Sequence, residues 1–372
     1  MRRSATMAIA LAAIWVFFGV SQPVFLSARN LSLLMIELAV TATLALGMLL
    51  VLLPGQIDLS VGSGVGLLGG LAAVLVFWQQ WPAPAALAVG AGAALVVWTA
   101  MGALVVLQRI PAFIITLGGL LVFKGLHWLV IRNRTVPVAE GGEQNLFSIL
   151  TTYYVPPAWG WALTGVIAMV FVGLRIRGLQ RRRRFALPVP DGELTFLGLF
   201  IGVQVLVLVT LVANQYRGLP LAALVLGAVA LAVHVVTRHT PFGRYLYAIG
   251  GNEEAAALSG VPVARVVIGA FSIMGLIVAL TGYMQTAYSG ASTTTVGSLM
   301  ELDAIAACVI GGTSLRGGRG TVVGVLFGAL VMASLLNGMT LMALAPELKL
   351  ITRGTVLALA VWLDVRFTAP GA

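Results

Sequence analysis

The sequence predicts an all-α polytopic integral membrane protein with about 10–12 transmembrane helices, some of them broken. Three observations predict this fold class. First, 60% of the 372 residues are hydrophobic and only 9% are charged, whereas soluble domains carry about 25% charged residues. Second, apolar runs of about 20 residues, long enough to cross the hydrocarbon core of a bilayer, recur along the chain. Third, the 44 glycines allow membrane helices to approach one another closely.

The apolar runs follow one another along the chain with short polar segments between them. Run 302–310 is too short to cross a bilayer alone, and we interpret it as half of a broken helix. Run 7–25 follows Arg2 and Arg3, but its length and the lack of a small-residue cleavage site favour a retained span over a signal peptide. The candidate spans, twelve in the central expectation, are 7–25, 31–53, 59–78, 84–107, 111–131, 161–174, 194–213, 219–236, 263–287, 302–310, 321–336 and 339–363.

The basic residues are distributed unevenly between alternate connections. If the N-terminus is cytoplasmic, the segments on that side carry 15 of the 22 Lys and Arg residues, which is the bias that the positive-inside rule requires. The expected topology is therefore N-in and C-in. We expect a single membrane domain over residues 1–372, with an outer loop at 131–160, a basic inner loop at 175–193 and a further inner loop at 237–262.

Several function classes lack the residue patterns that they need. The net charge of +10 does not indicate nucleic-acid binding, because the basic residues lie in short loops between apolar runs and not on an exposed face with aromatic residues. The single cysteine, Cys308, and three scattered histidines provide neither a disulfide framework nor metal-ligand spacing. The two lysines, Lys124 and Lys349, do not follow a P-loop pattern, so we expect no ATPase site in this chain.

A short capped helix is predicted within the inner loop 237–262. Asn252 is a good N-cap, and Glu253 and Glu254 follow it in the first turn, where the helix dipole favours negative charge. Three alanines continue the helix, Gly260 suits its left-handed C-terminal position, and a following proline prevents its continuation. Small side chains and two glutamates suit the docking of a soluble partner, although the same caps also fit an ordinary interhelical turn.

Four segments of the sequence carry a family resemblance. They are AIGGNEEAAALSGV in the inner loop, GQIDLSVGS at 55–63, ELDAIAACVIGGTSLRGGRG at 301–320 and the tail segment around 354–364. The first segment resembles the EAA-type coupling loop of ABC importer permeases. The other three resemble the sugar branch of that superfamily, the ribose, xylose and arabinose permeases. The extra segment at about 141–217 is most similar to xylose permeases, since shorter relatives lack such an insertion.

The resemblance implies a non-enzymatic permease subunit of an ATP-driven sugar importer in the bacterial inner (plasma) membrane. A cytoplasmic ABC ATPase subunit would use ATP and Mg²⁺, so this chain would bind no cofactor, and a periplasmic binding protein would deliver xylose or a related monosaccharide. Two permease copies would enclose the pathway as a homodimer in the lipid bilayer. The residues that the resemblance implies for ATPase docking are Gly251, Asn252, Glu253, Glu254, Ala255, Ala256, Ser259 and Gly260.

Polar side chains within or beside the apolar runs are candidates for the translocation pathway or its gating. Asp58 and Asp303 could contact the sugar, or they could cap the helices that begin near them. Glu37 lies inside run 31–53, where no cap explains it, and it could pair with Lys124. Most hydroxyls in membrane helices bond to their own backbone, so the serines are candidates only. The candidates are Asp58, Ser60, Ser63, Gln285 and Asp303.

Two other hypotheses are open. A permease of the same superfamily could carry another sugar or a branched-chain amino acid, and a zwitterion would favour charged pathway groups or helix N-termini aimed at its carboxylate. An ion-coupled secondary transporter would need titratable groups at mid-membrane. That alternative is less favoured, because few such groups exist and the capped helix would have no role in it.

Overall fold

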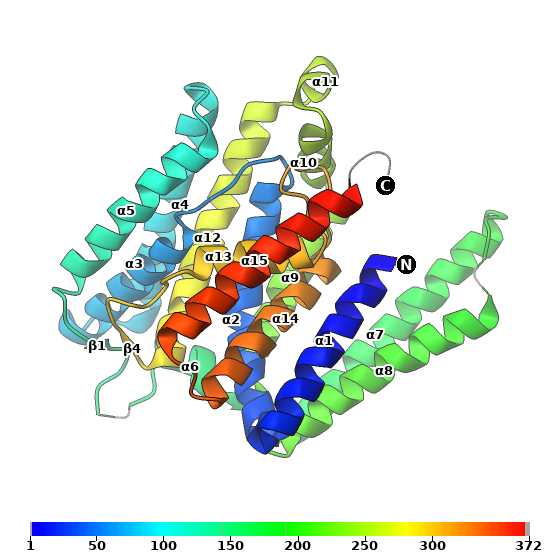
Figure 1. Cartoon of the computed structure of the whole chain (residues 1–372), viewed down its shortest axis with the longest axis horizontal. Helices are drawn as coiled ribbons and strands as arrows, with labels where there is room; N and C mark the ends of the chain where they lie inside the picture. The colour runs from blue at the N-terminus through cyan, green and yellow to red at the C-terminus, as the bar shows by residue number, and fades with distance from the viewer. Residues whose placement is uncertain (1, 142, 190, 369–372) are drawn as a thin grey trace.

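The computed structural model describes residues 2–141, 143–189 and 191–368, and this part of the chain is helical apart from two pairs of two-residue strands (Figure 1). Within it, nine helices are long and apolar enough to cross a membrane, which confirms the predicted fold class. These are α2 (Ala28–Leu52), α3 (Val61–Ala73) with the π-helical turn η2 (Val74–Trp78), α4 (Ala83–Leu107), α5 (Ala112–Val130), α7 (Pro157–Arg184), α8 (Gly192–Asn214), α9 (Leu221–His239), α12 (Val263–Ser289) and α14 (Val322–Leu341).

The remaining elements are shorter or flank this set. They are α1 (Arg2–Ser21), η1 (Pro23–Leu26), α6 (Leu146–Thr152), α10 (Pro241–Gly251), α11 (Glu253–Leu258), α13 (Met300–Ile310), α15 (Pro346–Thr368), and the antiparallel strand pairs β1 (Val136–Pro137) with β4 (Ala291–Ser292) and β2 (Tyr154–Val155) with β3 (Leu219–Pro220). α13 has 11 residues, or about 16 Å of helix. The expectation that run 302–310 is too short to cross a bilayer alone is therefore confirmed, while its interpretation as half of a broken helix stays a prediction.

The core of the bundle forms around α2 and α12. α12 packs against α2, α3 and α4, and α13 and α14 also pack against α2. Every residue from 42 to 54 is buried. Glycines bring α3 and α12 into backbone contact, since a Cβ on Gly282 would lie 2.6 Å from the Val65 carbonyl and a Cβ on Gly69 would lie 2.6 Å from the Gly282 carbonyl. The central helices are thus packed too closely to admit larger side chains at these positions.

Several connections lie toward one end of the molecule. Both termini, the α4–α5 turn, the tip of the α7–α8 hairpin and the α10–α11 segment are directed toward the end that is uppermost in Figure 1. These are connections that the arginine distribution assigns to the cytoplasm, so the fold is compatible with the expected N-in and C-in topology. The orientation in the membrane stays a prediction.

Two of the expected boundaries are wrong. Segment 175–193 is not a loop throughout, because α7 continues to Arg184 and only residues 185–191 connect it to α8. Arginine is a good helix former, and cations near a helix C-terminus are favoured by the helix dipole. The last two apolar runs were expected to be separated between residues 336 and 339. In the structure, α14 continues to Leu341 and α15 begins at Pro346, so the break lies later in the chain. The break contains Ala343 at a positive φ of 51°.

The α7–α8 hairpin stands away from the rest of the bundle (Figure 1). Only 6% and 11% of the most apolar windows of these two helices are buried. The hydroxyls of Thr164 and Thr210 are hydrogen-bonded to each other across the hairpin. At its base, β2 pairs with β3, so that Val155 lies opposite Leu219. The hairpin is therefore a peripheral unit with its own internal polar contact.

Candidate functional site

The inner loop expected at 237–262 folds into two short helices, α10 and α11. Thr240 Oγ1 caps α10 by accepting from the Gly243 N–H at 3.1 Å. Asn252 Oδ1 accepts from the Ala255 N–H at 2.9 Å at the start of α11, and Gly260 follows α11 at a φ of +82°. The predicted capped helix is therefore confirmed. α10 was not predicted, because its glycines and mixed polarity hide an amphipathic helix within a stretch that lacks a strong apolar run.

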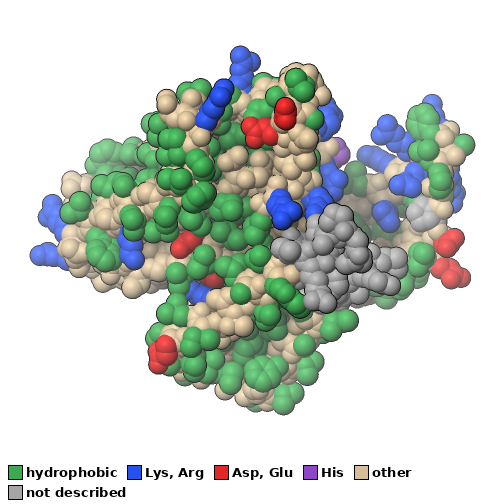
Figure 2. All heavy atoms as spheres, turned by 45° about the horizontal axis from the view of Figure 1, so that its top comes forward, with side chains coloured by type: hydrophobic (Ala, Val, Ile, Leu, Met, Phe, Trp, Pro, Cys, Tyr) green, Lys and Arg blue, Asp and Glu red, His purple; other side chains and the backbone are tan. Residues whose placement is uncertain are grey.

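The tip of this segment is open to a partner. The predicted docking residues are exposed, apart from Ala256, which is buried at 5% exposure. Glu253 and Glu254 lie in the first turn of α11, and Figure 2 shows acidic side chains gathered at this end of the molecule. Leu258, which was not among the predicted residues, is 86% exposed. Its position in the last turn of the capped helix was the signal that could have identified it.

The α10–α11 segment is seated on the backbone of two other connections. A Cβ on Gly250 would lie 1.8 Å from the Leu53 carbonyl oxygen and 2.3 Å from the Gly318 nitrogen. The Gly318 N–H in turn donates to the Leu53 carbonyl at 2.9 Å. Gly250 is therefore the point at which α10 meets both the α2–α3 connection and the α13–α14 connection, and only glycine leaves room for that contact. We call this contact of Gly250, Leu53 and Gly318 the glycine junction.

A side-chain hydrogen bond reinforces the glycine junction. Tyr247 Oη donates to the Gly320 carbonyl at 2.8 Å. Burial raises the pKa of the Tyr247 hydroxyl, so the tyrosine remains a protonated donor at neutral pH. In the same connection, Gly317 and Gly318 have positive φ of 86° and 73°, which glycine adopts readily. The glycine-rich segment 311–320 is thus a close-packed turn beneath α10.

Asp58 and Ser60 lie together at the buried start of α3. Asp58 Oδ1 accepts from the Ser60 N–H at 2.8 Å and from Ser60 Oγ at 2.6 Å, and Asp58 Oδ2 accepts from Trp98 Nε1 at 2.8 Å. Asp58 and Ser60 are fully buried. The expectation that Asp58 is the N-cap of a helix is wrong, because Ser60 occupies the N-cap position of α3. Asp58 instead accepts from Ser60 and Trp98 and so ties the start of α3 to α4.

The other pathway candidates lie apart from this cap. Ser63 is half-buried on α3, and Gln285 on α12 donates from Nε2 to Ser289 Oγ at 3.4 Å. Asp303 is 5% exposed, and its Oδ1 lies 3.5 Å from Arg353 Nε on α15. The expectation that Asp303 caps α13 is wrong, because Leu299 occupies the N-cap position and Asp303 lies in the first turn.

Glu37 has partners that the sequence did not predict. Its Oε1 accepts from Tyr288 Oη at 2.8 Å, and its Oε2 accepts from Asn337 Nδ2 at 3.1 Å. Asn337 Oδ1 accepts from Asn30 Nδ2 at 2.9 Å. The expected pairing of Glu37 with Lys124 is therefore wrong. The observed network instead joins α2, α12 and α14 through polar bonds within an otherwise apolar bundle.

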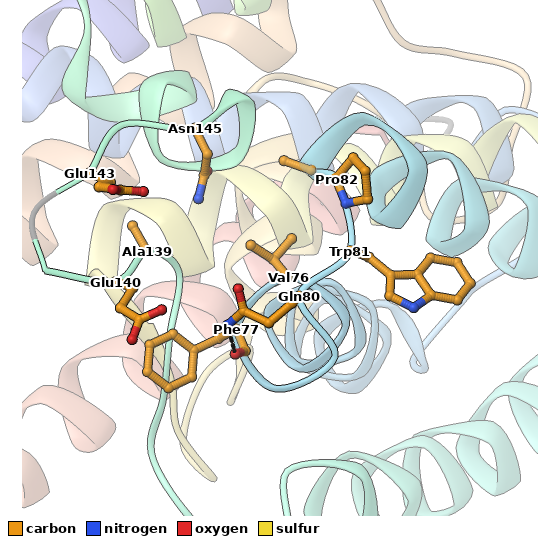
Figure 3. A pocket seen from close by; sticks show the side chains of 10 residues that line it. Val76, Phe77, Gln80, Trp81, Pro82, Ala139, Glu140, Glu143 and Asn145 are labelled. Atoms are coloured by element: carbon orange, nitrogen blue, oxygen red, sulfur yellow. Dashed lines mark hydrogen bonds between the residues drawn. The ribbon is translucent and has the colours of Figure 1, made fainter.

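A pocket of about 230 Å³ lies at the opposite end of the molecule from α11 (Figure 3). One wall comes from η2 and the connection to α4, including Phe77 and Gln80. The other wall comes from residues before α6, including Glu140, Glu143 and Asn145. Gln80 Nε2 donates to the Phe77 carbonyl at 2.8 Å. The face that is expected to be periplasmic therefore has a pocket lined by acidic and aromatic side chains.

Comparison with known proteins identifies the family. The family model described as branched-chain amino acid transport system / permease component matches residues 30–361. The chain is 40% identical to the xylose transport system permease protein XylH of Escherichia coli K12, over 96% of this chain and 90% of that protein. It is 39% identical to XylH of Haemophilus influenzae, over 96% and 95%, and 32% identical to the ribose import permease protein RbsC of E. coli K12, over 96% and 92%. No solved structure matches the chain. The chain therefore belongs to the permease family of branched-chain amino acid transport systems, as a multi-pass, non-enzymatic membrane subunit.

Proposed function

We propose that this chain is the membrane-spanning subunit of an ATP-driven importer for xylose or a related monosaccharide, with its substrate delivered by a periplasmic binding protein. The observation that carries the proposal is the exposed, doubly capped α10–α11 segment seated on the glycine junction. The choice of substrate is supported by 40% identity to a xylose permease over 96% of the chain.

The tip of α11 is the proposed docking site for a cytoplasmic ABC ATPase. The short side chains of Gly251, Ala255, Ser259 and Gly260 leave the backbone accessible, and Leu258 adds an apolar contact of 86% exposure. Asn252 fixes the start of the helix, while Glu253 and Glu254 offer charges to basic residues of the partner. Ala256 faces inward and holds α11 against the permease.

The glycine junction is the proposed route by which ATPase movement reaches the pathway. A displacement of α10 pushes directly on the Leu53 and Gly318 backbones, because no side chain lies between them. Leu53 leads into α3, and Gly318 lies between α13 and α14. ATP binding that drew two docked α11 helices together would therefore move α3 and α13, the two short helices of the core, relative to α12.

A homodimer of permeases would enclose the pathway, and a periplasmic binding protein would dock on the outer face. The concavity around Glu140 and Glu143 supports the second contact, since an acidic rim beside Trp81 offers both charge and an aromatic surface. Of the pathway candidates, Ser63, Gln285 and Asp303 retain partial exposure or open hydrogen-bonding capacity. Asp58 and Ser60 act instead as a buried support for α3.

Transport by reconstituted proteoliposomes tests the proposal. The chain is combined with candidate ATPase and binding-protein partners, and uptake of labelled xylose and ribose is measured with and without ATP. Glu254→Arg is expected to abolish ATPase association and uptake, because it places a cation where the partner meets carboxylates. Glu193→Arg changes another exposed glutamate, in the first turn of α8. It is the matched control and is expected to transport normally.

Either of two results would overturn this assignment. Uptake driven by a proton or sodium gradient and indifferent to ATP would identify a secondary transporter. ATP-dependent uptake of leucine in place of either sugar would identify a branched-chain amino acid permease, the second substrate class that the family description supports.

A further inference from the structure

Four ionisable side chains from α5, α13 and α15 lie near one another. Glu301 and Asp303 occupy the first turn of α13, and Asp303 Oδ1 lies 3.5 Å from Arg353 Nε on α15. The Glu301 carboxylate lies within electrostatic range of Asp303, Arg353 and Lys124 of α5. We call Lys124, Glu301, Asp303 and Arg353 the ionic strip. Figure 2 shows acidic and basic side chains near one another in the middle of a face that is otherwise largely hydrophobic.

Two members of the ionic strip, Asp303 and Arg353, lie away from the ends of the long helices. Arg353 is seven residues beyond the start of α15 at Pro346, which is about 10 Å along a helix. A charge at such a depth is costly in contact with hydrocarbon, and charged groups in membrane helices face a protein interior or a water-filled cavity. We infer that the face that carries the ionic strip meets protein or water and not hydrocarbon in the assembled transporter.

The ion pair at the centre of the strip is incomplete. Asp303 Oδ1 and Arg353 Nε are both buried and, in the described part of the chain, neither forms a hydrogen bond. At 3.5 Å the two atoms form an ion pair by distance, but a locked Arg–carboxylate pair has bonds of about 2.7–2.9 Å. Asp303, at 5% exposure, thus retains an open acceptor, and Arg353 retains an open donor beside it.

We propose that the ionic strip is a sugar-contact site on the wall of the translocation pathway, an inference that rests on the proposed function. The Asp303 carboxylate would accept a hydrogen bond from one hydroxyl of a monosaccharide, and the Arg353 guanidinium would donate to a neighbouring hydroxyl. The two carboxylates and two cations balance in charge, so the ionic strip has no net charge to exclude a neutral polyhydroxylated ligand. The same open carboxylate and guanidinium would also suit the two charged groups of an amino acid, so the choice of a sugar as the ligand rests on the proposed function.

Cysteine accessibility tests whether the strip faces water. The one natural cysteine, Cys308, is fully buried and provides an unreactive background. Arg353→Cys and Ile351→Cys are compared in the complex with ATPase and binding protein, using a charged methanethiosulfonate that reacts with thiolates in water. Ile351 is 64% exposed on the same helix, on a face expected to meet lipid or the second permease copy. Position 353 is expected to react at least about tenfold faster than position 351, and xylose is expected to slow its modification.

Arg353→Cys also removes the ion pair with Asp303, so a further variant tests the water accessibility of this face with the ion pair intact. Lys349→Cys lies one turn before Arg353 on α15 and leaves Asp303 and Arg353 intact, and it is expected to be labelled as Arg353→Cys is. Equal reactivity at positions 351 and 353, an unreactive Lys349→Cys, or labelling that neither xylose nor ribose slows would each overturn the proposed site. Wild-type xylose uptake tests the proposed function separately. If uptake is of ribose and ribose protects Arg353→Cys, the site stands and the xylose assignment fails.

Discussion

Truncation of the exposed leucine at the tip of α11, Leu258→Ala, is expected to weaken ATPase binding about 30-fold. The change removes three carbon groups, each of which contributes about 0.8 kcal/mol when it is transferred from water to an apolar site. Leu258 exposes 86% of its surface in the single chain, so almost all of that contribution is gained only on docking. Full coverage by the partner therefore gives about 2 kcal/mol, or a factor of roughly 30 in the dissociation constant.

The measurement is the affinity of purified ATPase for the permease in lipid nanodiscs, by biolayer interferometry. Leu174→Ala on the peripheral α7 helix, at 63% exposure, removes the same groups from a surface outside the proposed interface and is expected to leave binding unchanged. Neither change removes a buried side chain, so thermal stability is expected to stay within about 0.5 kcal/mol of wild type. If Leu258→Ala binds as tightly as Leu174→Ala, the tip of α11 is not covered by the ATPase and the docking argument is wrong.

Three other changes test the interior of the permease. Tyr247→Phe removes the hydrogen bond to the Gly320 carbonyl, which contributes about 1 kcal/mol. It is expected to lower the uptake of sugar per ATP hydrolysed while ATPase binding is retained. An unchanged ratio of uptake to ATP hydrolysis would contradict the glycine junction as the route from the ATPase to the pathway. Gly250→Ala introduces a Cβ 1.8 Å from a backbone oxygen and is expected to cost about 1–3 kcal/mol, measured as a lower melting temperature together with weaker coupling. Asp58→Ala leaves the Trp98 N–H unpaired at 1% exposure and is expected to destabilise the permease by about 1–3 kcal/mol, with Asp58→Asn as the milder control. An unchanged melting temperature would contradict its role in tying α3 to α4.

Local chemistry allowed the best predictions from the sequence. The α11 helix follows from a capping asparagine, two early glutamates and a C-terminal glycine, all within a few residues of one another. The half-length of α13 follows from the shortness of its apolar run. In both cases the determining interactions lie inside the element, so no knowledge of the rest of the fold is needed.

The errors arose where charge or long-range contact decides the structure. Arg181–Arg184 were assigned to a loop because of their charge, yet arginine favours a helix and suits its C-terminus, and α7 continues through all four. Pro346 marks the start of α15, but the expected run 339–363 was extended across it and across the charged residues that follow it. The partners of Glu37 come from Tyr288 and Asn337, 251 and 300 residues away, and only the assembled bundle brings them together.

The pairing of β2 with β3 has a consequence for how such a chain can change in length. Because Val155 lies opposite Leu219, the two ends of the α7–α8 hairpin are adjacent, at a Cα separation of about 4.5–5.5 Å for antiparallel partners. A tight turn could bridge that gap, so the whole hairpin can be gained or lost without altering the path of the chain on either side. The hydroxyl contact between Thr164 and Thr210 lies wholly within the hairpin and would be removed with it. Segment 157–214 is therefore a separable unit, because the chain before it and the chain after it are already adjacent where it begins and ends.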